Sequence, residues 1–441
     1  MRADAPSSTK PSGSAAALPT LLFILFINLV GFGIVVPLLP FYGKSFNASA
    51  WQVMLVFSAY AIGAFFGEPF WGRLSDRIGR KPILISTVCG NCLCYLALAF
   101  APNIYVAFLV RLMGGMASGN GAVVQGYIAD VTPGERRAGR MALLGAANNM
   151  GFIVGPALGG LLAHPAAGPA GFRTPLLVCA AFSAVSALSI TLFVAESRHR
   201  AHRFTHQPSR WDVLGTALGH PIIRRLMGVT FLAGCAFTGI EACFGLWAHA
   251  RFDWEPRQVG LAFAVVGIVA ATCQIFLVGR LSRRFGEARV LAAGMALTAS
   301  CALLQPLSTG GASTIVLMTF AAFGQSIAWP NVAALISRNV DMNHQGQYLG
   351  LNNATGALAR VTGPFFAGLA FSNVTVNAPF LMAGIIVAPA ILLAWSARRR
   401  RGSDDTDEES RRMASGVVIE AGSYGMEGAV QDARLSETRL S

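Results

Sequence analysis

The amino-acid sequence predicts an all-α membrane protein with twelve transmembrane helices in two six-helix halves. Of its 441 residues, 54% are hydrophobic and only 12% are charged, whereas soluble proteins carry about 25% charged residues. Apolar runs long enough to cross a bilayer follow one another along the chain. A short charged segment between two such runs, residues 72–82, returns in similar form at residues 279–288. Repeated membrane halves are typical of secondary transporters.

The twelve expected spans are apolar runs of bilayer length. They fall at residues 18–40, 52–71, 82–100, 104–128, 141–163, 175–195, 226–248, 259–278, 290–307, 313–336, 348–371 and 379–396. The N-terminal half is 18–195 and the C-terminal half is 226–396, and a basic cytoplasmic linker at 196–225 joins them. We expect the cytoplasmic segments 1–17 and 397–441, which hold few large apolar residues, to be disordered.

Basic residues are distributed unevenly between the two sides of these spans. The chain holds 34 Lys and Arg residues. Those on the side opposite the termini are Lys44, Arg173, Arg251 and Arg257. Because loops rich in Lys and Arg remain in the cytoplasm, we expect both termini inside and a multi-pass protein of the inner (plasma) membrane. The net charge of +13 follows from this bias, so no nucleic-acid partner is expected.

No catalytic or metal-binding pattern stands out in or beside the spans. The sequence lacks a nucleophile motif, a cofactor fingerprint and a His-rich cluster within them. All eight cysteines fall inside predicted spans, where a free Cys behaves as a small hydrophobe. We therefore expect neither an enzyme nor a metal or cofactor site.

The repeated charged segment reads GRLSDRIGRKP at residues 72–82. Its glycines permit tight turns, and Asp76 is an acid among bases that can accept charge-assisted hydrogen bonds. In the second-half copy, Arg283 stands where Asp76 stands in the first. The candidate functional residues of the segment are Gly72, Asp76, Arg77, Gly79 and Arg80.

This segment resembles the loop between helices 2 and 3 of the major facilitator superfamily, whose pattern is G-x-L-a-D-r-x-G-r-[KR]. The resemblance implies the major facilitator fold and a lock between the halves that opens during transport. It implies that Asp76 faces the start of the span at 348–371 and an Arg after the fourth span. The candidates for that Arg are Arg137 and Arg140, with Asp130 bracing them.

The fifth span carries small residues at helical spacing, which line one face and allow a partner helix to approach closely. They are Gly151, Gly155, Pro156, Gly159 and Gly160. The pattern resembles the fifth-helix motif of proton-coupled drug antiporters in the superfamily, with Ala142 as a departure where that motif has Gly. Helix packing alone also explains the spacing. The span at 348–371 repeats the Gly-Pro pair as Gly363 and Pro364.

Charged residues inside spans cost about 2.5–3.5 kcal/mol each to insert, so each one needs a reason. Those present are Arg111, Arg360, Glu68 and Glu241. The segment around Arg111 resembles the fourth-helix motif whose Arg is linked to proton coupling; snorkelling or a structural role is the alternative. Glu241 either carries a proton or holds a cationic substrate. Glu68 either belongs to the same proton-coupling or substrate site or has an interfacial, loop-bracing role. Asn28 and Cys94 stand where tetracycline exporters have acids, so a tetracycline–metal chelate is not the expected substrate.

The function that the sequence favours is export of a small amphipathic molecule in exchange for protons by alternating access. The resemblance to drug:proton antiporters covers all twelve spans. The partners are then the substrate, protons and the bilayer; the proton gradient supplies the energy, no cofactor takes part, and the protein is a monomer. A proton-coupled or facilitative importer of a metabolite shares the fold and is the first alternative. A non-transporting receptor or scaffold is the alternative of another class.

Overall fold

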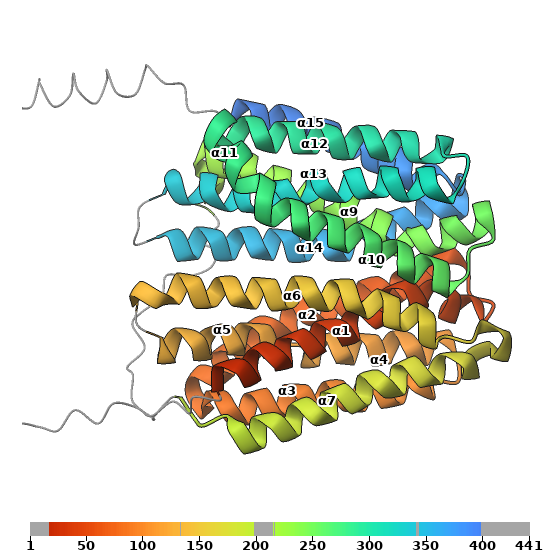
Figure 1. Cartoon of the computed structure of the whole chain (residues 1–441), viewed down its shortest axis with the longest axis horizontal. Helices are drawn as coiled ribbons and strands as arrows, with labels where there is room; N and C mark the ends of the chain where they lie inside the picture. The colour runs from red at the N-terminus through yellow and green to blue at the C-terminus, as the bar shows by residue number, and fades with distance from the viewer. Residues whose placement is uncertain (1–16, 133, 198–214, 216, 341–343, 398–441) are drawn as a thin grey trace, which may run out of the picture. The chain divides into compact units, whose positions relative to one another are not determined.

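A computed structural model describes residues 17–132, 134–197, 215, 217–340 and 344–397. These residues form helices joined by short connections, with no strand among them. The segments predicted to be disordered lie almost entirely outside the described residues, as does most of the linker. Figure 1 shows the described helices running side by side in two groups, α1 to α7 and α9 to α15.

The first group provides the six spans of the N-terminal half. Its elements are α1 (Ala17–Lys44), α2 (Ala50–Ile78), α3 (Arg80–Ala99), α4 (Ile104–Ala117), α5 (Asn120–Val131), α6 (Gly134–Leu162), the 3-10 helix η1 (Pro165–Phe172) and α7 (Arg173–Phe193). The span predicted at 104–128 is broken at Ser118 and Gly119, between α4 and α5. At the break, the Trp71 indole donates to the Met116 carbonyl at 2.6 Å, and a side chain on Gly119 would collide with Trp71.

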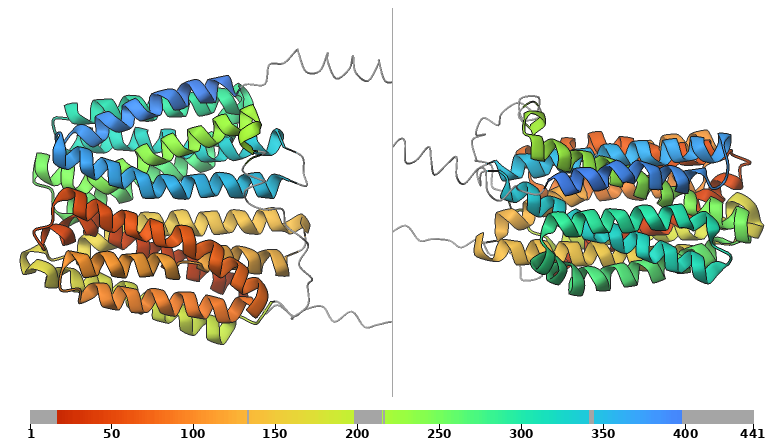
Figure 2. Two further views of the ribbon diagram at one scale, coloured as in Figure 1. Left: turned by 180° about the vertical axis from the view of Figure 1, so that it is seen from behind. Right: turned by 90° about the horizontal axis from the view of Figure 1, so that it is seen from above.

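The second group repeats this order in the C-terminal half. Its elements are α9 (Pro221–Phe252), α10 (Pro256–Cys273), the π-helix η2 (Gln274–Val278), α11 (Gly279–Phe285), α12 (Glu287–Leu304), the 3-10 helix η3 (Gln305–Leu307), α13 (Gly311–Arg338), α14 (Gln345–Asn373) and α15 (Ala378–Ser396). Figure 2 shows the two groups from behind and from above. The second half therefore also supplies six membrane-length helical runs.

Among the described residues, eleven helical runs are long and apolar enough to cross a membrane. The twelfth helix of the bundle is α14, which carries Asn352, Asn353 and Arg360 along its length. The bundle shields part of this polarity, because Asn352 is buried and accepts a hydrogen bond from Thr230 at 2.7 Å. The predicted class, an all-α membrane protein with twelve helices in two halves, is confirmed.

The turn between α2 and α3 is a single glycine. Gly79 has a φ of +118°, and its counterpart Gly286 between α11 and α12 has a φ of +83°; both values favour glycine. The expectation that Gly72 also makes a turn is wrong, because α2 continues through Ile78 and the Gly79 amide still bonds the Ser75 carbonyl. The charged segment is thus mostly helix.

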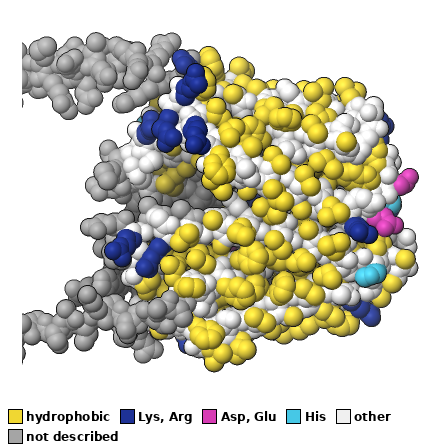
Figure 3. All heavy atoms as spheres, viewed as in Figure 1, with side chains coloured by type: hydrophobic (Ala, Val, Ile, Leu, Met, Phe, Trp, Pro, Cys, Tyr) yellow, Lys and Arg dark blue, Asp and Glu magenta, His cyan; other side chains and the backbone are white. Residues whose placement is uncertain are grey.

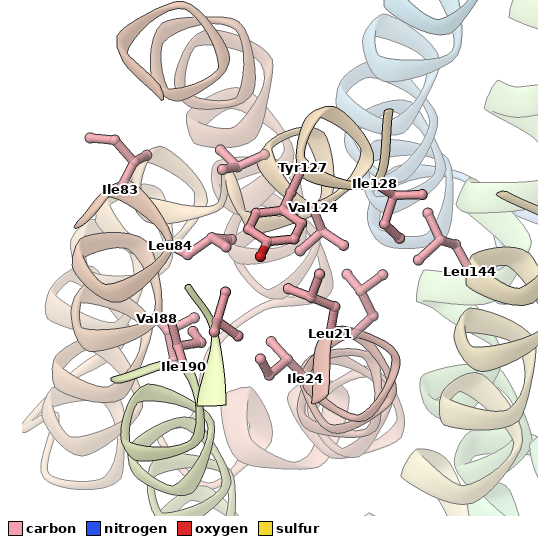
Figure 4. Close-up of a cluster of buried hydrophobic side chains, with 13 residues drawn as sticks. Leu21, Ile24, Ile83, Leu84, Val88, Val124, Tyr127, Ile128, Leu144 and Ile190 are labelled. Carbon is pink, nitrogen blue, oxygen red and sulfur yellow. The ribbon is translucent and has the colours of Figure 1, made fainter. Parts of the chain in front are cut away.

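Exposed arginines gather at one end of the bundle, which we call the basic end and define by Arg73, Arg77 and Arg283. Figure 3 shows most of the visible Lys and Arg side chains at that end. We call the opposite end, which carries Lys44 and Asp253, the far end. Near the basic end, apolar side chains of α1, α3, α5 and α7 pack around the ring of Tyr127 (Figure 4), whose hydroxyl donates to the Ala195 carbonyl at 2.9 Å.

The two halves touch closely toward the far end. The end of α6 meets the start of α10, where a side chain added to Gly160 would collide with the Pro256 carbonyl. The start of α2 meets the end of α14, where the Trp51 amide donates to the Ser372 hydroxyl at 3.1 Å. Glycines near the basic end have different surroundings. A Cβ added to Gly145, Gly346 or Gly350 would meet nothing within 4 Å.

Candidate functional site

A cavity of about 230 Å³ lies between α6 of the first half and five elements of the second. Its lining is mostly apolar. The residues are Asn149, Phe152 and Ile153 from α6; Phe237, Ile240 and Glu241 from α9; Phe263, Val266, Gly267, Ala270 and Ala271 from α10; Gln274 from η2; Thr298 from α12; and Met318, Ala321, Ala322, Gln325, Ser326 and Trp329 from α13. Glu241 is the one charged side chain among these lining residues.

Two acceptor oxygens in this lining have no hydrogen-bond partner among the described residues. They are Oε1 of Glu241 and Oε1 of Gln325, and both atoms are buried. Gln325 is 5% exposed. A buried acceptor without a partner costs about 1–3 kcal/mol, so both oxygens favour a ligand that brings donors. The cavity therefore suits an apolar molecule with at least one N–H or O–H group.

The other predicted cavity residues lie outside this lining. Arg111 is 4% exposed, and its guanidinium lies 4.4 Å from the centre of the Tyr60 ring. It lines a separate small pocket of the first half that also includes Tyr95. Asn28 donates from Nδ2 to the Ile24 carbonyl of its own helix at 2.8 Å. The structure thus does not bring Arg111 and Asn28 to Glu241.

Arg360 provides an electrostatic link between the halves. From α14 it lies near enough to Glu68 of α2 and to Glu241 of α9 for a Coulomb attraction to each carboxylate. No ion pair within 4 Å joins these described side chains, so the attraction acts over a longer distance. The helices that carry Glu68 and Arg360 pack directly, because the Ser58 hydroxyl of α2 donates to the Val361 carbonyl of α14 at 2.9 Å.

The glycine-rich face of α6 packs against α1. A Cβ on Gly151, Gly155 or Gly159 would lie 2.8, 2.6 and 2.5 Å from the carbonyl oxygens of Phe26, Val30 and Ile34, respectively. Real Cβ atoms do not approach backbone so closely, so only glycine fits at each of these three positions. Two further residues of the motif, Pro156 and Gly160, face α10. A Cβ on Gly160 would collide with the Pro256 carbonyl, and a Cβ on Gly260 of α10 would collide with the Pro156 carbonyl. The close approach that the spacing predicts is therefore present on two sides of α6.

Arg80, rather than Asp76, is the centre of the charged cluster at the basic end. Arg80 is 7% exposed. Its Nη2 lies 2.8 Å from Oδ1 of Asp76, and its Nε lies 3.0 Å from Oδ2 of Asp130. Its Nη1 donates to the Ser75 hydroxyl at 2.6 Å, and its guanidinium packs over Gly126, where a Cβ would lie 2.6 Å from Cζ. One buried cation therefore joins α2, α3 and α5.

The other residues predicted for this cluster lie in different surroundings. Arg140 donates from Nη1 to the Thr132 hydroxyl at 3.0 Å, within the connection between α5 and α6. Arg77 is exposed at the end of α2. The side chain of Arg137 lies outside the described residues. Asp76 pairs with Arg80, and its contact with the start of α14 stays a prediction.

Sequence reasoning missed Glu196, which the linker was expected to contain as a solvated residue. Its carboxylate accepts the Arg80 amide at 2.8 Å and the Lys81 amide at 3.1 Å. These are the first backbone donors of α3, and a carboxylate at a helix N-terminus is favoured by the helix dipole. It also missed Gln325, which with Asn331 is one of two side-chain amides in the largely apolar α13. A polar residue in such a helix was the signal that could have identified it.

Three comparisons place the chain among known proteins. The sequence model described as Major Facilitator Superfamily matches residues 21–255 and 226–431. Tetracycline resistance protein, class C, of Escherichia coli is 32% identical over 394 residues, which cover 87% of this chain and 96% of that protein. Multidrug resistance protein 2 of Bacillus subtilis (strain 168) is 26% identical over 387 residues, 86% of this chain and 95% of that protein.

A solved structure has a similar fold. It is a bacterial homolog of the human lysosomal transporter Spinster, in an inward-facing and unoccupied conformation. It matches with a TM-score of 0.72 at 15% identity, over 86% of this chain and 96% of that one. At this identity the likeness concerns the arrangement of the helices.

Proposed function

This chain belongs to the major facilitator superfamily, and we propose that it exports a small amphipathic molecule in exchange for protons by alternating access. It is a multi-pass membrane transporter and not an enzyme. We place it in the inner (plasma) membrane as a monomer with both termini in the cytoplasm. In this proposal the proton gradient supplies the energy and no cofactor takes part.

The observation that carries the proposal is the carboxylate of Glu241 in an apolar cavity between the halves. A carboxylate withdrawn from water takes up a proton more readily than one in solvent, and a nearby cation opposes this. A proton and a cationic group of the substrate then compete for Glu241. Competition for one group is sufficient to couple the two movements in opposite directions.

The packing of the halves supports alternating access. They are in close contact toward the far end, whereas glycines of α6 and α14 near the basic end have open surroundings. The positive-inside rule assigns the basic end to the cytoplasm. In this proposal the state is open to the cytoplasm, and exporters and importers both pass through such a state. The relatives with resistance in their names favour export over import.

We assign the other candidate residues roles around this centre. Arg360 balances the charges of Glu68 and Glu241. Arg111, held over the Tyr60 ring, provides a buried positive charge in the first half. Asn28 keeps its place in α1 through its bond to the Ile24 carbonyl. The cluster around Arg80 acts as a conformational lock. In the same proposal, the glycine face of α6 lets α1 and α10 approach closely enough to close the far end.

The test is exchange in liposomes that contain the purified full-length protein. With an imposed pH gradient, we expect outward transport of amphipathic dyes or antibiotics that stops when an uncoupler collapses the gradient. Glu241→Gln should abolish pH-driven exchange more than it weakens substrate binding. Accumulation in the direction of proton flow would instead identify an importer, and binding without any flux would identify a receptor.

A further inference from the structure

We infer that the cavity selects a compact aromatic ammonium ion by its N–H groups, which are shared between Glu241 and Gln325, and that Gln325 is the residue that sets this specificity. The inference rests on the proposed function and names the substrate class of the same site. It predicts that primary ammonium ions are favoured over N-methylated ions of the same shape.

The charge of the substrate follows from the lining. Glu241 is its one charged residue, and the walls around it are mostly apolar. A carboxylate in such surroundings is stabilised by an opposite charge that also gives it a hydrogen bond. A ligand with a single positive charge meets both needs, whereas the carboxylate would repel an anion.

The size and shape of the substrate follow from the cavity volume and its rings. At about 230 Å³, the cavity is smaller than the range of about 300–1,000 Å³ that drug-sized ligands occupy. Phe152, Phe237, Phe263 and Trp329 line the cavity from four different helices. Aromatic rings stack on planar ligands and attract cations. One or two fused rings with a short ammonium arm fit this lining.

Gln325 differs from the other neutral polar lining residues, whose side chains already take part in hydrogen bonds. The hydroxyl of Thr298 donates to the Gly294 carbonyl at 3.0 Å, and that of Ser326 donates to the Phe323 carbonyl at 2.8 Å. The amides of Asn149 and Gln274 lie within hydrogen-bonding distance of each other, at 3.5 Å. Among these side chains, the structure leaves Gln325 and Glu241 with buried acceptors that have no partner in the described residues.

Two separate acceptors distinguish ammonium ions by how many N–H groups they carry. In the inferred complex, a primary ammonium ion has three N–H groups and donates to both oxygens. A dimethylammonium ion has a single N–H, which goes to the carboxylate because charge-assisted bonds are stronger, so Gln325 is left without a partner. A trimethylammonium ion has no N–H group, so it leaves both oxygens without a hydrogen-bond partner. Sites built to bond a donor reject analogues that lack it.

The experiment measures binding to purified full-length protein by calorimetry. The probes are 2-(1-naphthyl)ethylamine, its N,N-dimethyl derivative and its quaternary N,N,N-trimethyl derivative, each as the cation. For the wild type we expect two successive losses of affinity, each about tenfold or more. Gln325→Met should abolish the first loss, between primary and dimethyl, and keep the second. Glu241→Gln should weaken all three probes.

The control is Gln305→Met, the same substitution at a buried glutamine outside the cavity, whose Nε2 donates to the Thr314 carbonyl at 3.3 Å. It should keep both affinity losses.

Equal binding of primary and trimethyl probes to the wild type would overturn the inference without any variant. A first loss that persists in Gln325→Met would also overturn it. Proton exchange with neutral or anionic compounds, but not with these cations, would overturn it and leave the proposed function standing. Binding of the series without any proton exchange would refute the proposed function instead.

Discussion

Glu287 and Arg338 form an ion pair of 2.7 Å at the positions that correspond to Arg80 and Asp130 in the first half, with both charges exchanged. Each pair joins the first residue of the third helix of its half to the end of the fourth span. Arg283 likewise takes the position of Asp76. The repeat has therefore kept the ion pair and inverted its sign, and Arg283 carries the matching inversion in the sequence.

The two pairs should differ in their contribution to stability. The Arg80 side chain is 8% exposed, whereas that of Arg338 is 70% exposed. Breaking a buried pair costs about 3–5 kcal/mol, and an exposed pair contributes about 0–1 kcal/mol. We expect Arg80→Met to lower the melting temperature in detergent much more than Arg338→Met does. Similar shifts for the two variants would show that Arg80 is not a structural centre.

Asp76→Asn should slow transport and leave the fold intact. The substitution keeps the shape of the side chain and removes the charge that faces Arg80 at 2.8 Å. Hydrogen bonds to charged groups contribute about 1.5–3 kcal/mol, so a state that depends on this bond should lose about tenfold in population or more. Turnover in liposomes, with substrate affinity measured in parallel, tests this. Wild-type turnover would contradict the lock.

The helices and the repeat could be predicted from the sequence because they depend on composition and spacing. Apolar runs of bilayer length fixed the spans, and the paired Gly79 and Gly286 marked equivalent turns. The partners inside the bundle could not be predicted. A helix such as α9 is apolar on most faces, so hydropathy does not say which way Glu241 points, nor that Gln325 shares its cavity while Arg111 does not.

The centre of the loop cluster was also beyond the sequence. Asp76 stood out as the one acid among bases, but burial decides which charge gathers the others, and Arg80 is the buried one. Glu196 could not be assigned because its contact joins segments more than a hundred residues apart. Such contacts follow from tertiary packing and not from local spacing.

Gly159→Ala should disturb the packing of α6 on α1. The new methyl group would lie 2.5 Å from the Ile34 carbonyl oxygen, so the helices must separate. In the same helix, Gly145→Ala meets nothing within 4 Å and should stabilise the helix by about 0.5–1 kcal/mol. We expect Gly159→Ala to lower the melting temperature and to raise proton leak in liposomes, whereas Gly145→Ala does neither. Matching behaviour of the two variants would mean that the α6–α1 contact is not a seal.

Arg360 should show its strongest effect through the acids on either side of it. If it balances Glu68 and Glu241, then Arg360→Gln leaves two carboxylates without a cation, and like charges in a poorly solvated space repel. Removing one acid as well should relieve that repulsion. We therefore expect Arg360→Gln to impair exchange strongly and Glu68→Gln in the same protein to restore part of it.

A double-mutant cycle on exchange rate and on melting temperature measures this coupling. Glu255→Gln is the control for the second substitution, because Glu255 lies at the start of α10, where its amide bonds Gln258 and no link to Arg360 is seen. It should give no rescue. Because Glu241 is the proposed exchange group, Glu241→Gln should not restore exchange in the Arg360→Gln protein even where it restores stability. Additive effects of Arg360 and Glu68 would mean that Arg360 acts on neither acid, and the balance of charge between the halves would have to be sought at Arg111.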